Sequence, residues 1–177
     1  MLKKILIVIV ALLAAFLAVA AMQPDTFTVT RTATVAAAPE TVFALVNDFH
    51  EWPKWSPWEQ LDPNMTRTHT GSPAGQGASY AWTGNSDVGS GRMTIAESRP
   101  NEHVRIDLEF IEPFASKSIT DFSFQPEGAG TKVEWKMSGD NNFISKIFGL
   151  LMGGMDKMVG PDFEKGLAQM KSAAESM

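Results

Sequence analysis

The sequence predicts an α+β domain in which a seven-stranded antiparallel sheet wraps around a long C-terminal helix, preceded by an apolar helix. Three observations predict this fold class. Residues 65–139 show short alternating runs separated by Gly, Pro, Asn and Asp clusters at hairpin spacing. From residue 142 onward, β-branched residues become rare and apolar residues take helical spacing. Three of the five tryptophans fall in Trp52–Trp58, a stretch with two prolines that must pack at a defined place.

Residues 1–22 form a segment directed to a membrane. After Lys3 and Lys4, the 18 residues from Ile5 to Met22 include no charged or strongly polar side chain. This run exceeds the roughly 7 to 15 residues of a signal-peptide core and reaches the ~18 that can span a bilayer, so we expect an uncleaved anchor. Ala18-Val19-Ala20 also fits a signal-peptidase site, which leaves a secreted domain open, and a buried core helix is the third alternative.

The first two alternatives both export residues 23–177. Lys3 and Lys4 hold the N-terminus in the cytoplasm by the positive-inside bias, so we expect the domain on the extracytoplasmic, periplasmic side. Removing residues 1–22 leaves 155 of the 177 residues, which is enough for one domain with a full hydrophobic core.

Charge and composition exclude several classes of partner. Without Lys3 and Lys4, 13 basic residues stand against 20 acidic ones, a net charge of −7, which argues against nucleic acid. The absence of cysteine excludes disulfides, thiolate nucleophiles and cysteine-ligated metals. The only histidines, His50, His69 and His103, lack the spacing of a metal site, so we expect neither a metal nor another cofactor. The oligomeric state is not readable from the sequence.

The first elements follow from local patterns. Phe27–Val35 alternates apolar residues with Thr and Arg, as a half-buried strand does. Ala38-Pro39-Glu40 begins a helix, because proline and an acidic residue suit a first turn, and this helix ends near Asp48. Trp52–Trp58 follows as a short second helix that Leu61-Asp62-Pro63 ends.

The remaining elements are a meander and a helical tail. The predicted strands span residues 65–70, 78–83, 91–98, 103–111, 116–125 and 131–139. Gly153-Gly154 and Gly160-Pro161 are predicted to break the helical region that follows. A last helix is predicted to begin at Pro161 and to direct Phe163, Leu167 and Met170 inward.

This order resembles the helix-grip fold of START, Bet v 1-like and polyketide cyclase/dehydrase proteins, the SRPBCC superfamily. Ala37–Phe43 looks like the family's entry to its first helix. Trp52–Trp58 and Gly160–Leu167 resemble segments of the polyketide cyclase/dehydrase and lipid-transport branch, and the likeness covers about Thr26 to Met170. In such a fold, the space between sheet and helix becomes a cavity, so the resemblance implies a ligand-holding protein.

The candidate cavity-lining residues are large aromatic or thioether side chains, which suit variable apolar ligands. They are Trp55, Trp58, Tyr80, Trp82, Phe110, Phe122, Trp135, Met152, Met155 and Phe163. Ordinary core packing is the alternative for the tryptophan cluster and the methionines. Period 2 places Val104, Ile106, Leu108 and Phe110 on the cavity side of one strand, and its charged residues in solvent. Phe143–Met158 is read either as packing on the sheet or as an apolar flap that touches the bilayer.

Three functions remain open. The first is binding or carriage of a hydrophobic small molecule or lipid without chemistry. The second is a cyclase or dehydratase that uses general acid-base catalysis in the cavity, although no catalytic residue is identified, since no nucleophile or phosphate-loop motif exists. The third is an envelope scaffold or partner-binding module. A wholly apolar cavity favours the first, an inward carboxyl or a hydrogen-bonded Tyr80 hydroxyl favours the second, and a solid core favours the third.

Overall fold

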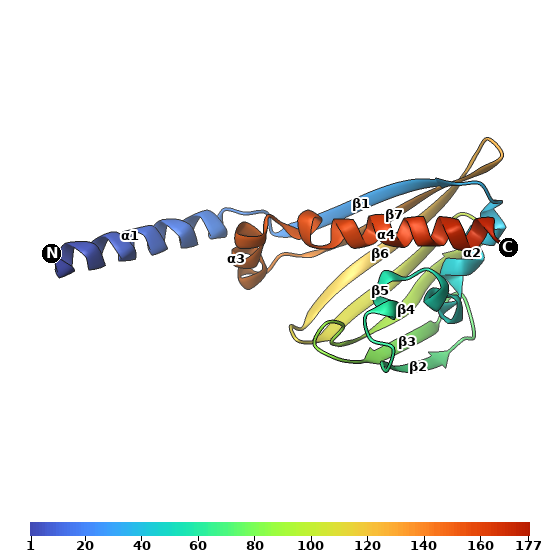
Figure 1. Ribbon diagram of the computed structural model, residues 1–177, viewed down its shortest axis with the longest axis horizontal. Coiled ribbons are helices and arrows are strands. Elements are labelled where there is room, and N and C mark those ends of the chain that lie inside the picture. The colour runs from blue at the N-terminus through green and yellow to red at the C-terminus, as the bar shows by residue number, and fades with distance from the viewer.

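A computed structural model describes residues 1–177 (Figure 1). Helix α1 (Leu2–Ala21) projects away from the rest of the chain, and nearly all of its side chains are exposed. The helices that follow are α2 (Pro39–Asn47), the 3₁₀ helices η1 (Phe49–Lys54) and η2 (Pro57–Gln60), α3 (Phe143–Met152) and α4 (Met155–Glu175).

The strands form one antiparallel sheet in the order β1-β7-β6-β5-β4-β3-β2. They are β1 (Thr26–Val35), β2 (Thr66–Gly71), β3 (Ala78–Thr83), β4 (Ser90–Arg99), β5 (His103–Glu112), β6 (Ser116–Glu127) and β7 (Gly130–Asp140). Consecutive strands are joined by hairpins, except for the longer connection from β1 to β2. The first strand, β1, pairs along its full length with the last strand, β7. The predicted fold class is confirmed, and each predicted strand lies within two residues of the observed one.

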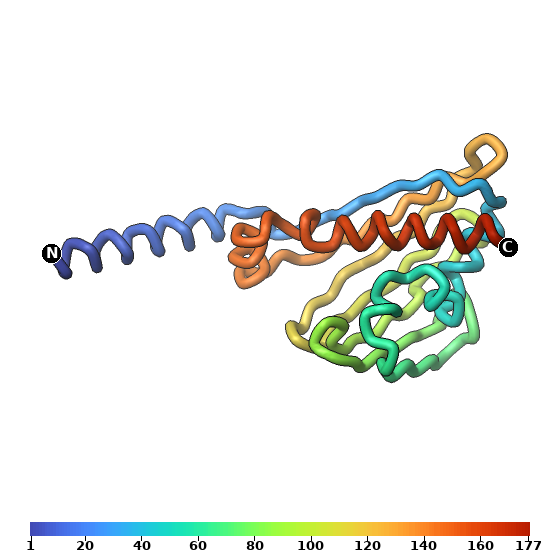
Figure 2. Tube along the Cα trace, in the orientation of Figure 1, coloured from blue at the N-terminus to red at the C-terminus, as the bar shows by residue number.

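Helix α4 lies across the concave face of this sheet and runs beside β1 and β7 (Figures 1 and 2). Its buried stripe includes Phe163, Leu167, Met170 and Ala174, at the spacing of one helical face. The predicted inward residues of the last helix are therefore confirmed.

The predicted start of this helix was wrong. The break at Gly153-Gly154 is present, with φ angles of 86° and 91°, but α4 begins at Met155 and continues through Pro161. Long-range contacts hold the first three turns: Arg31 Nη1 lies 2.7 Å from Asp156 Oδ1, and Arg31 Nε lies 2.7 Å from Glu164 Oε1. These ion pairs support the helix on both sides of the hydrogen bond that proline cannot form.

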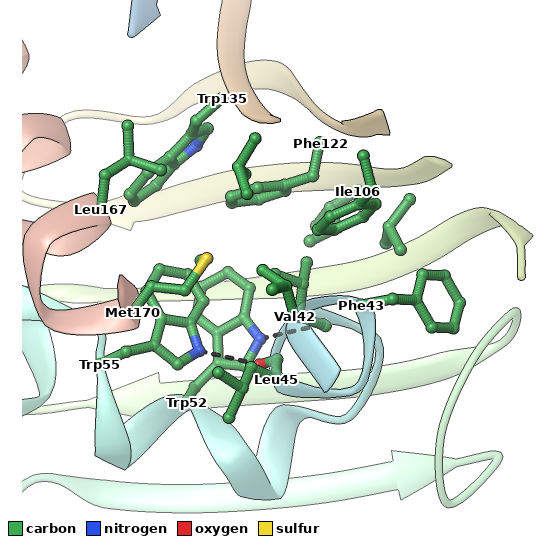
Figure 3. Close-up of a cluster of buried hydrophobic side chains, with 14 of the residues drawn as sticks. Val42, Phe43, Leu45, Trp52, Trp55, Ile106, Phe122, Trp135, Leu167 and Met170 are labelled. Atoms are coloured by element: carbon green, nitrogen blue, oxygen red, sulfur yellow. Dashed lines mark hydrogen bonds between the residues drawn. The ribbon is translucent and has the colours of Figure 1, made fainter. Parts of the chain in front are cut away.

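The aromatic turn packs between α2 and the sheet (Figure 3). Trp55 is fully buried, and its Nε1 donates to the Leu45 carbonyl at 2.8 Å. Trp52 Nε1 donates to the Val46 carbonyl at 3.1 Å. The ring of Trp55 meets that of Phe122 edge-on at a centroid distance of 5.9 Å. Each indole therefore buries its apolar ring and still satisfies its N–H group.

The space between the sheet and α4 has two ends. At one end, which we call the α1 end, β1 begins opposite the last residue of β7, since Thr26 pairs with Asp140. Antiparallel alternation brings the starts of β4 and β6 and the ends of β3 and β5 to the same side. We call the opposite side, where β1 leads into α2, the α2 end. The two ends lie far apart in Figure 1.

Candidate functional site

A cavity of about 270 Å³ lies between the sheet and the helices. Thirteen of its 17 lining residues are hydrophobic. The wall from the sheet comprises Tyr80, Trp82, Met93, Leu108, Phe110, Thr120, Trp135 and Met137. Most of these positions lie within four residues of the strand terminus at the α1 end, which places the cavity toward that end.

Aromatic rings form most of the wall. Trp135 and Phe163 stack at a centroid distance of 4.0 Å, with 10° between their planes. Trp58 meets both rings edge-on, at 5.8 Å and 6.2 Å. Trp82 meets Phe110 at 5.9 Å. These edge-to-face and stacked contacts fix the wall, which is therefore preformed and apolar.

The Trp82 ring depends on a glycine in the neighbouring strand. Gly91 lies opposite Trp82 in the β3–β4 register. A Cβ atom at Gly91 would lie 2.5 Å from Trp82 Cη2 and 2.6 Å from the Glu109 carbonyl oxygen. The glycine thus lets the ring lie flat along β4, beside the cavity.

One charged group is buried in the wall. Glu59, on η2, is 8% exposed, and its Oε1 accepts a hydrogen bond from the Tyr80 hydroxyl at 2.5 Å. Arg67 Nε donates to the other carboxylate oxygen, Oε2, at 2.7 Å. Both oxygens of the buried carboxylate are therefore paired, as a charge in an apolar interior requires.

These contacts affect the pKa values of Tyr80 and Arg67, which form a triad with Glu59. Burial, together with the hydrogen bond to Glu59, raises the pKa of Tyr80 well above its ordinary value. The hydrogen bond to Glu59 also raises the pKa of Arg67. The tyrosine hydroxyl thus stays protonated and acts as a donor at neutral pH, beside a cationic guanidinium.

Two further polar groups adjoin the cavity. Trp82 Nε1 donates to the Val88 carbonyl at 3.0 Å, which holds the β3–β4 turn against the wall. Trp135 Nε1, in contrast, is buried with no hydrogen-bond partner. An unpaired buried donor costs free energy, about 1–3 kcal/mol, so this N–H group is a polar feature of the interior that no protein group satisfies.

The structure brings six of the ten predicted cavity residues onto the wall: Trp58, Tyr80, Trp82, Phe110, Trp135 and Phe163. Trp55 and Phe122 lie in the adjoining solid core, fully buried. Met155 is half-buried at the start of α4, and Met152 is exposed on α3. Contact of these side chains with a ligand stays a prediction for all ten.

Sequence reasoning missed Glu59 and Arg67. The local sequence predicts that a glutamate beside Trp58 lies in solvent at the end of the turn. Nothing nearby indicates burial, because its partners are eight and 21 residues away in the chain. The available signal was chemical: Tyr80 is the only tyrosine in the sequence and lies on the same strand face as Trp82. A buried phenol of that kind needs a partner.

The structure brings no three His, Asp or Glu side chains together in a way that could hold a metal ion. His50 and His69 stack at a centroid distance of 4.2 Å, and Asp48 contacts His50 Nδ1 at 2.7 Å. Burial lowers the pKa of His69, and the neighbouring His50 lowers it further.

A seven-stranded sheet that grips a long C-terminal helix over an apolar cavity defines the helix-grip class of proteins. The family model described as polyketide cyclase / dehydrase and lipid transport matches residues 26–175. The chain therefore belongs to that family, and the expected SRPBCC-type membership is confirmed. No curated protein matches the sequence.

Solved structures share the fold at low sequence identity. A protein of unknown function from Staphylococcus aureus superposes with a TM-score of 0.64 at 13% identity, over 86% of this chain and 95% of its own. Protein CV1439 from Chromobacterium violaceum gives 0.60 at 16% identity, over 86% and 99%. DynU16, a protein of the dynemicin biosynthetic locus, gives 0.55 at 14% identity, over 86% and 48%. At such identities the likeness establishes the fold alone.

Proposed function

We propose that residues 23–177 form a domain that binds or carries a hydrophobic small molecule or lipid, without chemistry. The observation that carries this proposal is the preformed aromatic cavity. Its volume of about 270 Å³ lies near the lower limit of small-molecule sites, roughly 300–1,000 Å³. Such a volume suits a compact apolar ligand, or one segment of a longer lipid.

The polar groups of the wall support recognition of one polar end of the ligand. The unpaired Trp135 N–H is a donor, so a carbonyl or ether oxygen is the complementary ligand group. Thr120 adds a hydroxyl to the same wall. A mostly apolar molecule with a single acceptor therefore matches the cavity best.

Carriage is favoured over catalysis because the buried carboxylate is already engaged. A general base must reach the proton that it removes, and both oxygens of Glu59 are bonded within the protein. The cyclase or dehydratase alternative retains one specific observation in its favour, since a buried carboxylate and a protonated phenol lie together on the cavity wall. The scaffold alternative predicts a solid core, which the cavity argues against.

We propose that residues 1–22 anchor this domain to a membrane, on its extracytoplasmic side. Helix α1 has 20 residues and a mean hydropathy of 2.8 over its best window, and only 6% of that window is buried. A signal sequence passes the same test, so secretion after cleavage is the alternative. The placement of the domain outside the cytoplasm depends on Lys3 and Lys4.

Native mass spectrometry with lipid extraction tests the binding proposal, using the full chain purified from the envelope of its own host. Val159→Trp fills the cavity, because Val159 lines it, and Met158→Trp at the exposed neighbouring position is the matched control. We expect an apolar species with the wild type and with Met158→Trp, but not with Val159→Trp. A wild-type protein that is empty and also fails to bind fatty acids and phospholipids would overturn carriage.

For the catalytic alternative, Glu59→Gln and Tyr80→Phe are the informative variants. If they abolish turnover of a cyclic or hydroxylated ligand while its binding is retained, the cavity is an active site. Loss of binding alone would assign these residues to the structure of the wall.

A further inference from the structure

The α1 end carries an exposed apolar surface that the cavity does not use. Its members, which we call the α3 patch, are Phe114, Phe143, Ile144, Phe148, Leu151 and Met152. Their exposed fractions range from 43% to 67%, and all but Phe114 belong to α3. Contiguous exposed apolar side chains on a soluble surface mark a site of interaction.

The α3 patch joins two distant parts of the chain. Phe114 lies in the turn between β5 and β6, and its ring lies 6.0 Å from that of Phe148. The sheet and α3 thus present one continuous apolar surface at the α1 end.

The only charge in α3 is turned away from this surface. Lys146 is 7% exposed, and its Nζ lies 2.5 Å from Asp25 Oδ1, in the link between α1 and β1. This ion pair lowers the pKa of Asp25. Because the ammonium is buried, α3 adds no exposed charge to the patch, and the exposed charge beside it is the carboxylate of Asp25, whose side chain is 94% exposed.

Helix α3 is also fixed beside the point at which α1 leaves the domain. The backbone N–H of Asn141 donates to the Asp25 carbonyl at 2.7 Å, and Asn141 Nδ2 donates to the Pro24 carbonyl at 3.2 Å. Helices α1 and α3 are in direct contact, and Figure 1 shows α3 directly below the end of α1. A membrane crossed by α1 therefore lies within reach of α3.

We propose that the α3 patch lies in the interface of the bilayer that α1 spans, so that the cavity exchanges its apolar ligand directly with that membrane. The proposal rests on the anchoring and ligand binding proposed above. A bilayer is favoured over a protein partner because the patch continues the apolar surface of α1 and α3 itself exposes no charge. The net charge of −7 beyond α1 leaves apolar insertion as the source of attraction.

The position of the cavity supports the exchange. Phe110 and Val159 line the cavity close to the α1 end, since Phe110 lies two residues before the end of β5 and Val159 lies four residues after the start of α4. The cavity and the α3 patch therefore lie at the same end of the fold.

The absence of cysteine makes a direct test possible, since each introduced thiol is the only one in the chain. The full chain is reconstituted in phosphatidylcholine vesicles, and single-cysteine variants are labelled with an environment-sensitive fluorophore. Phe148→Cys and Leu151→Cys probe the α3 patch, and Val10→Cys probes α1. Glu127→Cys, at the exposed last residue of β6 on the α2 end, is the control.

We expect lipid-borne nitroxide to quench the labels at positions 148, 151 and 10, and aqueous iodide to quench the label at position 127. If nitroxide quenches the label at position 10 but iodide quenches the labels at 148 and 151, the α3 contact is overturned and the anchor stands. Lipid quenching at 148 and 151 without quenching at 10 would support the contact and overturn the anchor. Labels at 148 and 151 that are shielded from both quenchers would overturn the proposal in favour of a protein partner or a second copy of the chain.

Discussion

The two ends of the space between the sheet and α4 contain the same kinds of residue but differ in packing. Toward the α2 end, Trp55 is fully buried against Phe122 and α2. Toward the α1 end, Trp58 is half-buried and lines a cavity. Only two residues separate these tryptophans, so one short turn closes a core on one side and builds a cavity wall on the other.

The stacked pair of Trp135 and Phe163 marks the boundary between the two ends. Both residues belong to the main core cluster, and both line the cavity. Beyond Phe163, toward the C-terminus, Leu167 and Met170 fill the space under α4. Before it, Val159 is the only other α4 residue on the cavity wall, and its small side chain leaves the space unfilled. Side-chain volume along one helix therefore decides where the interior is hollow.

The largest effect is expected at the α2 end. Trp55→Ala should lower the free energy of unfolding by roughly 3–5 kcal/mol, because a large cavity forms in a solid core and an indole hydrogen bond is lost. Urea denaturation of the full chain in detergent, followed by far-ultraviolet circular dichroism, measures it. A loss below about 1 kcal/mol would mean that the two ends do not differ in packing.

Glu59→Gln should have the next largest effect, a destabilisation of about 2 kcal/mol, since it leaves Arg67 with a neutral partner. We set the value below that of a fully buried pair because the Arg67 side chain is 27% exposed. Arg67→Lys is the matched variant that retains the charge. If both variants lose the same free energy of unfolding, the planar guanidinium of arginine, with its several N–H donors, matters as much as the charge of the carboxylate.

The same triad predicts a pH dependence. The raised pKa of Tyr80 means that the unfolded chain, with an ordinary value of 10.0, releases this proton before the folded chain does. Stability from this group is therefore complete below pH 10 and falls as the pH rises above it. Because the chain has one tyrosine, tyrosinate absorbance reports Tyr80 alone. Glu59→Gln should shift that titration toward lower pH, and an unchanged titration would remove Glu59 as a cause.

Trp58→Ala should lower the free energy of unfolding by about 1–2 kcal/mol, less than Trp55→Ala or Glu59→Gln. One side of the Trp58 ring already lines the cavity, so it has fewer contacts to lose. It should, however, weaken binding of an apolar fluorescent probe. Denaturation and probe titration of the same sample separate the two effects. A stability loss equal to that of Trp55→Ala would identify Trp58 as core and contradict the comparison.

Local patterns predicted most of the fold. The alternation of apolar and polar residues marks each strand, and glycines mark the hairpin turns, so both signals lie within the segment that they describe. Tyr80 and Trp82 were expected on one face, and both line the cavity. The errors lie where partners are distant. Arg31 supports the start of α4 across 125 and 133 residues, so nothing near Pro161 shows that the helix continues. Glu59 is buried because Tyr80 and Arg67 satisfy it, which no pattern near Trp58 could reveal.

The smallest effect on folding is expected on the outside of the α1 end. Phe148→Ser removes a side chain that is 43% exposed, so we expect the free energy of unfolding to change by about 0.5 kcal/mol or less. Transfer of an apolar probe from the cavity to phosphatidylcholine vesicles should nevertheless become slower, while probe affinity stays unchanged. Lys132→Ser, on the exposed face of β7, is the control for a surface change away from the patch. If both variants transfer the probe at the wild-type rate, the cavity exchanges its ligand through water. The position of the cavity beside α1 then has no role in transfer.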